Sequence, residues 1–171
     1  MISRRAVLMI SVAAAAIAAK RLAPAFAQPA LAEPYEITRT DQEWRALLTD
    51  AQFDVLRLGM TEVPGSSYLL TERRPGMYQC AGCRLPVYSF EHKYNAGTGF
   101  LSFWLAEDDA IRTGIDNALD FPRVEVHCRR CASHLGFIFN DGPRWTAFSQ
   151  FFHRPGKRHS INGVALEFVP G

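Results

Sequence analysis

The stretches Cys80-Ala81-Gly82-Cys83 and Cys128-Arg129-Arg130-Cys131 decide the fold, because they hold all four cysteines of the 171-residue chain. A Cys-x-x-Cys turn presents two thiolates to one tetrahedral ion, and two such turns complete a closed structural zinc site. The 44 residues between Cys83 and Cys128 exceed the spacing within a single zinc finger, so the ion would tie together two distant parts of one domain. We therefore predict one structural Zn²⁺ per chain. Two disulfides or one redox-active dithiol are the alternatives.

The first 27 residues have the composition of an export signal. Arg4 and Arg5 form a twin arginine, residues 6–19 carry no charge, and Ala25-Phe26-Ala27 has the form of a cleavage site. An apolar run of 14 residues is too short for a comfortable membrane span. These features predict a twin-arginine signal peptide over residues 1–27, a periplasmic location and no stable membrane span after cleavage. A Sec signal, an uncleaved anchor and a cytosolic chain with an apolar start are the alternatives.

The rest of the chain is predicted to form a loose arm at residues 28–39 and a single domain at residues 40–171. The whole chain has 19 basic and 17 acidic residues, a formal charge of +2. Four of the basic residues and none of the acidic ones lie in residues 1–27, so 15 basic and 17 acidic residues remain and the charge becomes −2. A slightly negative domain attracts phosphate backbones poorly, and we expect no nucleic-acid binding.

Two short helices are predicted at the start of this domain. Thr40 and Glu43 have the spacing of a capping box, which marks the beginning of a helix. Apolar residues follow at helical spacing, and each set is expected to face the core. These residues are Trp44, Leu47 and Leu48 in the first helix, and Phe53, Leu56 and Met60 in the second, with Gly59 near its end.

Short strands are predicted after the helices, because apolar and aromatic residues alternate between Gly and Pro turns. They cover residues 76–79, 85–90, 123–127, 134–139 and 160–169. A strongly bent antiparallel sheet would bury the many aromatic side chains of this region. The expected fold class is therefore mainly β (α+β), with a short helical N-terminal segment and a four-cysteine zinc site.

The sequence around the cysteine pairs resembles the methionine-R-sulfoxide reductase family of the MsrB type. The similar stretches come in the family's order, from about Glu43 to Val169, at residues 74–83, 97–99, 102–103, 128–136, 139–143 and 158–166. The resemblance implies a zinc-stabilised bent β fold. It also implies reduction of the R-epimer of methionine sulfoxide in proteins, by a cysteine thiolate that attacks the sulfoxide sulfur and becomes a sulfenic acid.

Three departures from the family pattern fall on its catalytic residues. Ser160 stands where the resemblance places the nucleophilic cysteine, Phe100 at the pocket tryptophan, and Phe137 at the active-site histidine. An oxygen nucleophile cannot accept the sulfoxide oxygen and form a sulfenic acid. Zinc would occupy all four cysteines, so no other thiol could replace the missing one. We therefore predict a domain that has lost the reductase chemistry.

Four other residues match family positions that surround the nucleophile or bind the sulfoxide, namely His134, Asp141, Arg158 and Asn162. Each also has a simpler interpretation: a core histidine, a turn aspartate, a solvated arginine and a hairpin asparagine. With the resemblance, they predict a site that still binds methionine-containing or oxidised peptides. The alternatives are a reductase that works by another route and a periplasmic thiol–disulfide protein that uses one cysteine pair.

A segment rich in aromatic residues lies between Asp141 and Ser160 and is longer than the family usually has there. Residues 143–153 contain Trp145, Phe148, Phe151, Phe152 and His153. Each aromatic side chain has a large apolar area that favours burial. The segment is predicted to fold over the former active site as a plug, or to present an aromatic surface to a partner or an apolar ligand.

Overall fold

The computed structural model describes residues 34–144 and 156–171 of the chain. The predicted signal peptide, residues 28–33 of the predicted arm and the aromatic residues from Trp145 to His153 lie outside the described residues. Within the described ranges, no helix is long and apolar enough to cross a membrane. All residues of the predicted metal and substrate sites lie inside these ranges.

Two short helices begin the described domain, and a capping box starts each of them. Helix α1 spans Asp41–Leu47 after the predicted cap at Thr40, and α2 spans Asp50–Leu58 after a second cap at Thr49. Gly59 ends α2 in the left-handed conformation, with φ of 69°, which costs glycine least because it has no Cβ. Both predicted helices are therefore confirmed.

Two side chains assigned to the buried faces of these helices are instead exposed. Leu47 is 61% exposed and Met60 is 53% exposed, whereas Trp44 and Leu48 are buried as expected. Leu48 is the C-cap of α1 and has an extended backbone, which lets the chain bring Leu48 rather than Leu47 onto the core. Met60 follows the left-handed turn at Gly59 and is no longer part of α2.

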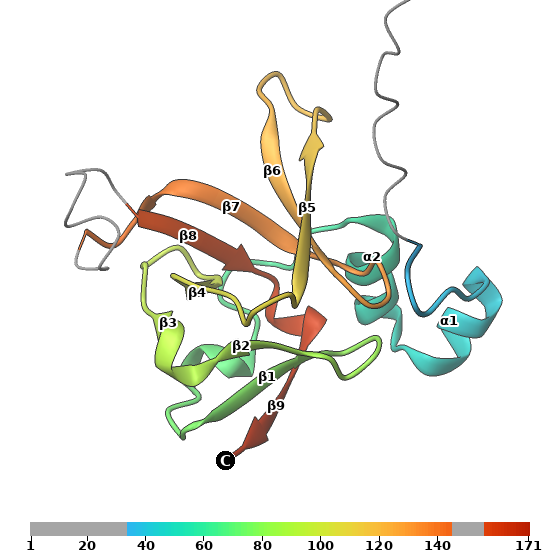
Figure 1. The fold of residues 1–171 in the computed structure, drawn as a ribbon, viewed down its shortest axis with the longest axis horizontal. Helices are drawn as coiled ribbons and strands as arrows, with labels where there is room; N and C mark the ends of the chain where they lie inside the picture. The colour runs from blue at the N-terminus through green and yellow to red at the C-terminus, as the bar shows by residue number, and fades with distance from the viewer. Residues whose placement is uncertain (1–33, 145–155) are drawn as a thin grey trace, which may run out of the picture. The chain divides into compact units, whose positions relative to one another are not determined.

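The described strands form two antiparallel sheets (Figure 1). The larger sheet has six strands in the order β3-β4-β8-β7-β6-β5, and the smaller has three in the order β2-β1-β9. This architecture confirms the expected mainly β fold with a helical N-terminal segment. The strands are β1 Gly76–Cys80, β2 Pro86–Ser89, β3 Lys93–Tyr94, β4 Leu101–Phe103, β5 Ile111–Asp116, β6 Arg123–Cys128, β7 His134–Gly142, β8 Gly156–Ile161 and β9 Leu166–Pro170, with short 3₁₀ helices η1 at Tyr68–Thr71, η2 at Phe90–His92 and η3 at Gly163–Ala165.

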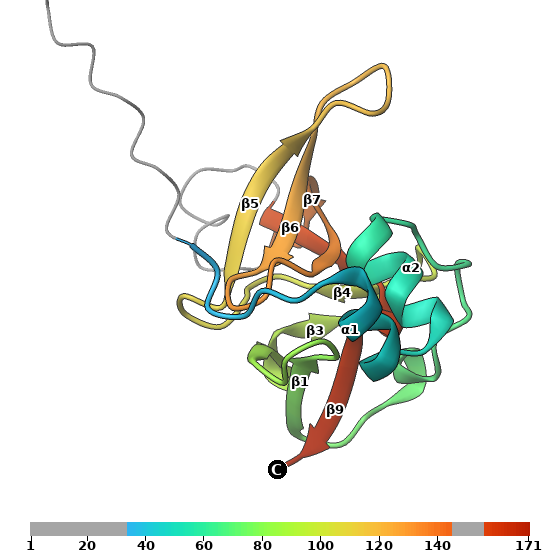
Figure 2. The ribbon, with the colours of Figure 1, turned by 90° about the vertical axis from the view of Figure 1, so that its right-hand side faces the viewer.

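The single strand predicted at residues 160–169 is wrong. The chain forms β8 in the six-stranded sheet, turns through η3, and continues as β9 in the three-stranded sheet (Figures 1 and 2). Asn162 causes the break, because its side-chain amide donates to the carbonyl of Leu135 and its amide oxygen accepts the N–H of Glu62. These bonds fix a corner where the period-two alternation predicted a continuous strand.

The core joins both sheets to both helices. Trp44 of α1, Phe53 of α2 and Tyr78 of β1 are buried in one cluster with Ile161 of β8. Tyr78 meets Phe103 edge-on at 5.1 Å between ring centroids, and Phe103 stacks on Tyr88 at 4.3 Å. Aromatic pairs in these geometries add to the free energy gained from apolar burial. Strands β5 and β6 form a hairpin that projects away from this core in both views (Figures 1 and 2).

Candidate functional site

The four cysteines gather into one cluster that could hold a metal ion. Their sulfur atoms all lie within 4.8 Å of one another, and three of the four residues are buried. The two closest pairs join the two turns: Cys80 Sγ lies 3.7 Å from Cys131 Sγ, and Cys83 Sγ lies 3.5 Å from Cys128 Sγ. A disulfide needs about 2.05 Å between sulfurs. Four thiolates about 2.3 Å from a tetrahedral ion lie about 3.8 Å apart, so this set fits a four-coordinate site.

Several polar groups surround Cys131 in the cluster. The neighbouring thiols, with Cys128 contributing most, lower the pKa of Cys131, and the Ser133 hydroxyl lies 3.1 Å from its sulfur. Arg57 donates from Nη1 to the backbone carbonyl of Cys131 at 3.0 Å, which places a positive charge beside the cluster. Partners of this kind orient the ligands of a metal site and tune its affinity.

Residues 34–39 contact the second cysteine turn. Glu36 forms ion pairs with Arg129 and Arg130, and the Ile37 N–H donates to the carbonyl of Arg130 at 3.0 Å. Arg130 in turn donates weakly to the carbonyl of Cys83 across the cluster, at 3.4 Å. The end of the predicted arm is therefore tied to the backbone that carries the cysteines.

The second candidate site lies on one face of the strands β6, β7 and β8. Phe137 of β7 is paired with Glu125 of β6 on one side and with Ser160 of β8 on the other. Phe139 is paired with Arg158. Because side chains opposite one another in an antiparallel sheet point to the same face, these five residues share one surface of the sheet.

A cavity of about 240 Å³ opens on this face. It brings together five of the predicted site residues, because Ser160, Arg158, Asn162, Phe100 and Phe137 all line it. The other described lining residues are Thr61, Thr98, Arg123 and Phe139. Neither His134 nor Asp141 belongs to this lining, so the two act on the cavity only through other side chains.

Arg158 is a buried, paired residue rather than a solvated cation. It is 8% exposed, and its Nε and Nη2 atoms donate to the two oxygens of Asp141, both at 2.8 Å. These hydrogen bonds lower the pKa of Asp141, so the carboxylate stays ionised. The guanidinium also lies over the ring of Phe139, at 4.7 Å. Asp141 thus fixes the orientation of an arginine that lines the cavity.

Arg123 is arranged in the same way on the opposite side of β7. Its Nη2 donates to Asp116 at 2.5 Å, and its guanidinium lies 3.9 Å from the ring centre of Phe137. The sequence prediction missed this residue. The strand pattern could have identified it, because Arg123 and Glu125 are two residues apart in β6 and therefore point to the same face of the sheet.

His134 is buried, with 3% of its surface exposed, and it faces a carboxylate. Its Nδ1 donates to Glu125 at 2.6 Å, and the same carboxylate reaches His127 at 3.1 Å. Burial lowers the pKa of His134, which keeps the ring neutral at pH 7. The ring packs against Phe137 at 5.2 Å between centroids, so His134 supports the wall of the cavity from behind.

Residues 48–170 match the family model described as the SelR domain. The chain is 38% identical over 135 residues to the peptide methionine sulfoxide reductase MsrB of Methanosarcina mazei, covering 78% of this chain and 90% of that protein. It is 40% identical over 143 residues to the mitochondrial methionine-R-sulfoxide reductase B2 of Rattus norvegicus, covering 79% and 77%. The chain belongs to the MsrB family.

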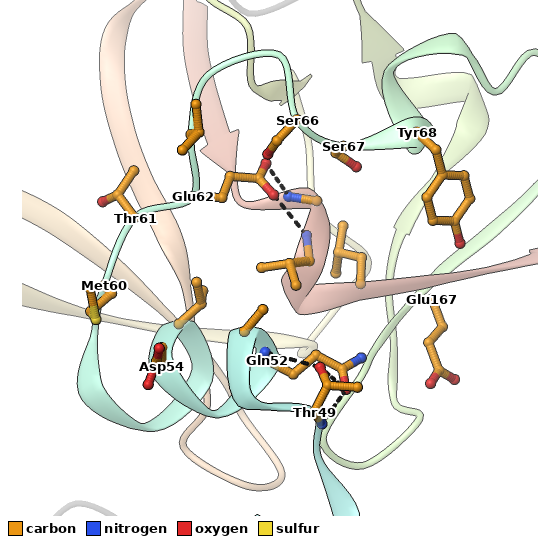
Figure 3. A pocket seen from close by; sticks show the side chains of 16 residues that line it. Thr49, Gln52, Asp54, Met60, Thr61, Glu62, Ser66, Ser67, Tyr68 and Glu167 are labelled. Atoms are coloured by element: carbon orange, nitrogen blue, oxygen red, sulfur yellow. Dashed lines mark hydrogen bonds between the residues drawn. The ribbon is translucent and has the colours of Figure 1, made fainter.

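In this MsrB domain, the loop before η1 contacts the turn between β8 and β9. Glu62 accepts the backbone N–H groups of Gly163 and Val164, at 2.7 and 3.0 Å, as the dashed lines in Figure 3 show. The N–H of Glu62 donates to Asn162 at 3.1 Å. Asn162 is therefore a bridging residue, and the interpretation as a hairpin asparagine is wrong.

Another cavity, of about 600 Å³, is lined in part by the same loop (Figure 3). It is bounded by α2, the segment from Met60 to Tyr68, and the η3–β9 turn. Thr61 lines both this cavity and the smaller one beside Ser160. The Glu62 contacts thus fix the residue next to Thr61, which lines both of these cavities.

Proposed function

We propose that this MsrB-family protein does not reduce methionine sulfoxide and instead acts as a binding domain for methionine-containing or oxidised peptides. The observation that carries the proposal is the distribution of sulfur. All four cysteines lie in the metal cluster, and no cysteine or methionine is among the described residues that line the cavity of Ser160. A hydroxyl oxygen cannot take up the sulfoxide oxygen, whereas a thiolate can and becomes a sulfenic acid.

Zinc is the metal that the cluster fits best under this proposal. Cys80, Cys83, Cys128 and Cys131 would hold it, and four thiolate ligands leave no coordination position for water or substrate. When bound, such an ion supplies folding free energy and no catalytic chemistry. The spacing between sulfurs supports this assignment over the disulfide alternative, and with it the exclusion of a thiol–disulfide protein.

Binding is supported by what the cavity retains. Arg158 and Asn162 keep the partners that fix them, and Phe100 and Phe137 provide apolar walls. A pocket with a few oriented polar groups and aromatic walls suits a small side chain with an oxygen acceptor. The twin arginine at Arg4 and Arg5 supports export to the periplasm as part of the same proposal.

A reductase assay tests the proposed loss of activity. The protein, with its metal content measured, is incubated with a peptidyl methionine-R-sulfoxide and dithiothreitol, and thioether formation is followed by chromatography. We expect about one zinc per chain and no turnover by the wild-type protein or by Ser160→Ala. Enzymatic turnover by the zinc-loaded wild-type protein would overturn the proposal and restore the alternative of a reductase with another route.

Export is tested separately in a bacterial host. The full chain should appear in the periplasmic fraction with about 27 residues removed, as measured by mass spectrometry. Replacing Arg4 and Arg5 by lysine should retain it in the cytoplasm if the twin-arginine route is used, whereas a Sec substrate would still be exported.

A further inference from the structure

We propose that the cavity beside Ser160 is a receptor for a small oxyanion on a short apolar stem, such as an alkyl sulfonate or carboxylate, and that it prefers this group to a neutral sulfoxide. The inference deepens the proposed function and rests on it, because it requires an uncharged serine where the family resemblance expects a cysteine. The arrangement of charge, donors and walls in the cavity supports it.

The charged groups that line the cavity are all positive. Of its nine described lining residues, Arg123 and Arg158 are cations, and none is an aspartate or glutamate. Their partners Asp116 and Asp141 lie outside the lining. A ligand inside the cavity therefore contacts the guanidinium groups directly, whereas the two paired carboxylates are not among the residues that line it. Because charge interactions weaken with distance, this arrangement attracts an anion even though the pairs are neutral overall.

The guanidinium groups keep donor capacity that the fold does not use. Arg123 and Arg158 each lie over a phenylalanine ring, at 3.9 Å from Phe137 and 4.7 Å from Phe139. Stacking occupies the flat face of a guanidinium and leaves its in-plane N–H groups for oxygen acceptors. The Nε atom of Arg123 is buried and has no hydrogen-bond partner in the described part of the chain. A buried N–H group without a partner destabilises the fold. A ligand oxygen that accepts a hydrogen bond from this group would therefore bind favourably.

Hydroxyl groups add neutral donors to the same space. Ser160, Thr61 and Thr98 line the cavity, and each carries a hydroxyl group. A hydroxyl can donate to an anionic oxygen, and such charge-assisted bonds are stronger than bonds between neutral groups. A thiolate at residue 160 would instead bring a negative charge into the cavity and repel an anion.

The walls limit the size of the ligand and are largely apolar. Phe100, Phe137 and Phe139 supply the apolar surface, and a volume of about 240 Å³ is smaller than the sites that hold drug-sized molecules. A stem of three or four carbons with one terminal oxyanion fits these dimensions. Apolar walls also lower the local dielectric, which strengthens the attraction between the two guanidinium groups and the anion.

Calorimetric titration of the zinc-loaded full chain tests the proposal at low salt. The probes are propane-1-sulfonate and butyrate, which represent the two oxyanion classes, and methyl propyl sulfone as a neutral analogue of similar shape. We expect at least one oxyanion to bind at least tenfold more tightly than the sulfone, and the affinity to fall as salt is added. Equal affinities for anion and sulfone, or no binding of either anion, would overturn the proposal.

Variants locate the binding in this cavity. Arg123→Gln should weaken anion binding at least fivefold and leave sulfone binding unchanged, and Arg123→Lys should lose less because it keeps the charge. Lys157→Gln is the matched control, since Lys157 is exposed on the same strand as Ser160 and does not line the cavity. If Lys157→Gln weakens anion binding as much as Arg123→Gln, the anion binds to general surface charge and the proposal is wrong.

Residue 160 provides a second test that does not depend on the arginines. Ser160→Ala should retain the preference for the anion, whereas Ser160→Cys should lose it as the pH is raised through the ionisation of the new thiol. An anion affinity that ignores this ionisation would contradict the proposal. These outcomes are separate from the reductase assay: turnover by the wild-type protein refutes the loss of catalysis, whereas absent anion preference refutes only the nature of the ligand.

Discussion

Ser160 and Phe137 lie directly opposite one another in the antiparallel pair β7–β8. These are the two positions where the family resemblance expects the nucleophilic cysteine and an active-site histidine. Side chains opposite one another in a sheet form a contact pair, so the two substitutions change one local unit rather than two distant parts of the domain. Chemistry that needs both groups therefore has to be restored at both positions.

The double variant Ser160→Cys/Phe137→His should reduce a peptidyl methionine-R-sulfoxide about 100-fold faster than Ser160→Cys alone. The cysteine restores the sulfur that accepts oxygen, and the imidazole supplies an acid near the leaving oxygen, an effect usually worth 10² to 10⁴ in rate. Turnover with dithiothreitol is the measurement, and Ser160→Ala/Phe137→His is the inactive control. Equal rates for the single and double variants would show that Phe137 is no obstacle to catalysis.

Cys128→Ser should lose the bound metal and the cooperative thermal unfolding transition. Structural zinc sites supply about 10 to 16 kcal/mol, which is comparable to the whole unfolding free energy of a domain. Metal analysis and calorimetry are the measurements. Ser133→Ala is the control: it removes the hydroxyl 3.1 Å from Cys131 and should lower zinc affinity roughly tenfold while keeping the fold. An unchanged melting temperature for Cys128→Ser would contradict a structural role of the metal.

Glu62→Gln should lower the unfolding free energy by about 1 to 3 kcal/mol. The carboxylate accepts two backbone N–H groups at the start of η3, and an amide can accept only one of them. Urea unfolding gives the value. Glu91→Gln, at an exposed position, is the matched control and should change stability by less than about 0.5 kcal/mol. Similar losses in the two variants would mean that the η3 contacts contribute nothing specific.

The unfolding free energy should fall as the pH is lowered from about 6.5 to about 4, in part because of His159. This residue is 7% exposed, its Nδ1 lies 3.1 Å from the Tyr88 hydroxyl, and burial lowers its pKa to about 4. A folded pKa below the unfolded one means that the unfolded chain binds the proton first, so stability is complete above about 6.5 and declines below it. One pKa unit corresponds to 1.36 kcal/mol, which gives roughly 3 kcal/mol over this window.

His159→Asn should flatten this part of the pH dependence, because asparagine keeps a polar atom near Nδ1 and does not titrate. Urea unfolding at several pH values measures the slope for each variant. Tyr88→Phe is the control: it removes the hydroxyl but keeps the burial, so the slope should remain. A slope that survives in His159→Asn would assign the acid sensitivity to other groups.

Local sequence signals were sufficient for the helices and for the cysteine cluster. A capping box and a left-handed glycine act through neighbouring residues, so Thr40 and Gly59 could be identified without knowledge of the fold. The cysteine spacing carries its own geometric constraint, and the four sulfurs are brought together as predicted. The residues of the cavity beside Ser160 were found through the family resemblance, not through local patterns.

Features that depend on distant contacts could not be predicted in this way. The break between β8 and β9 depends on Asn162, whose partners at Glu62 and Leu135 are 100 and 27 residues away in sequence. The pairing of Arg158 with Asp141 could not be predicted either. In the sequence alone, Arg158 was open to interpretation as a solvated cation. Period-two alternation cannot show which sheet a strand joins, because a strand of either sheet can bury every second residue.

The pairing of β1 with β9 determines when this protein can fold. Five residues of β1, from Gly76 to Cys80, are paired with the last strand of the domain. A nascent chain therefore cannot complete the smaller sheet until β9 has left the ribosome, and contacts so distant in sequence form slowly. Cys80 lies on β1, so a chain that lacks β9 should misplace one cysteine of the cluster and be removed by proteases during synthesis.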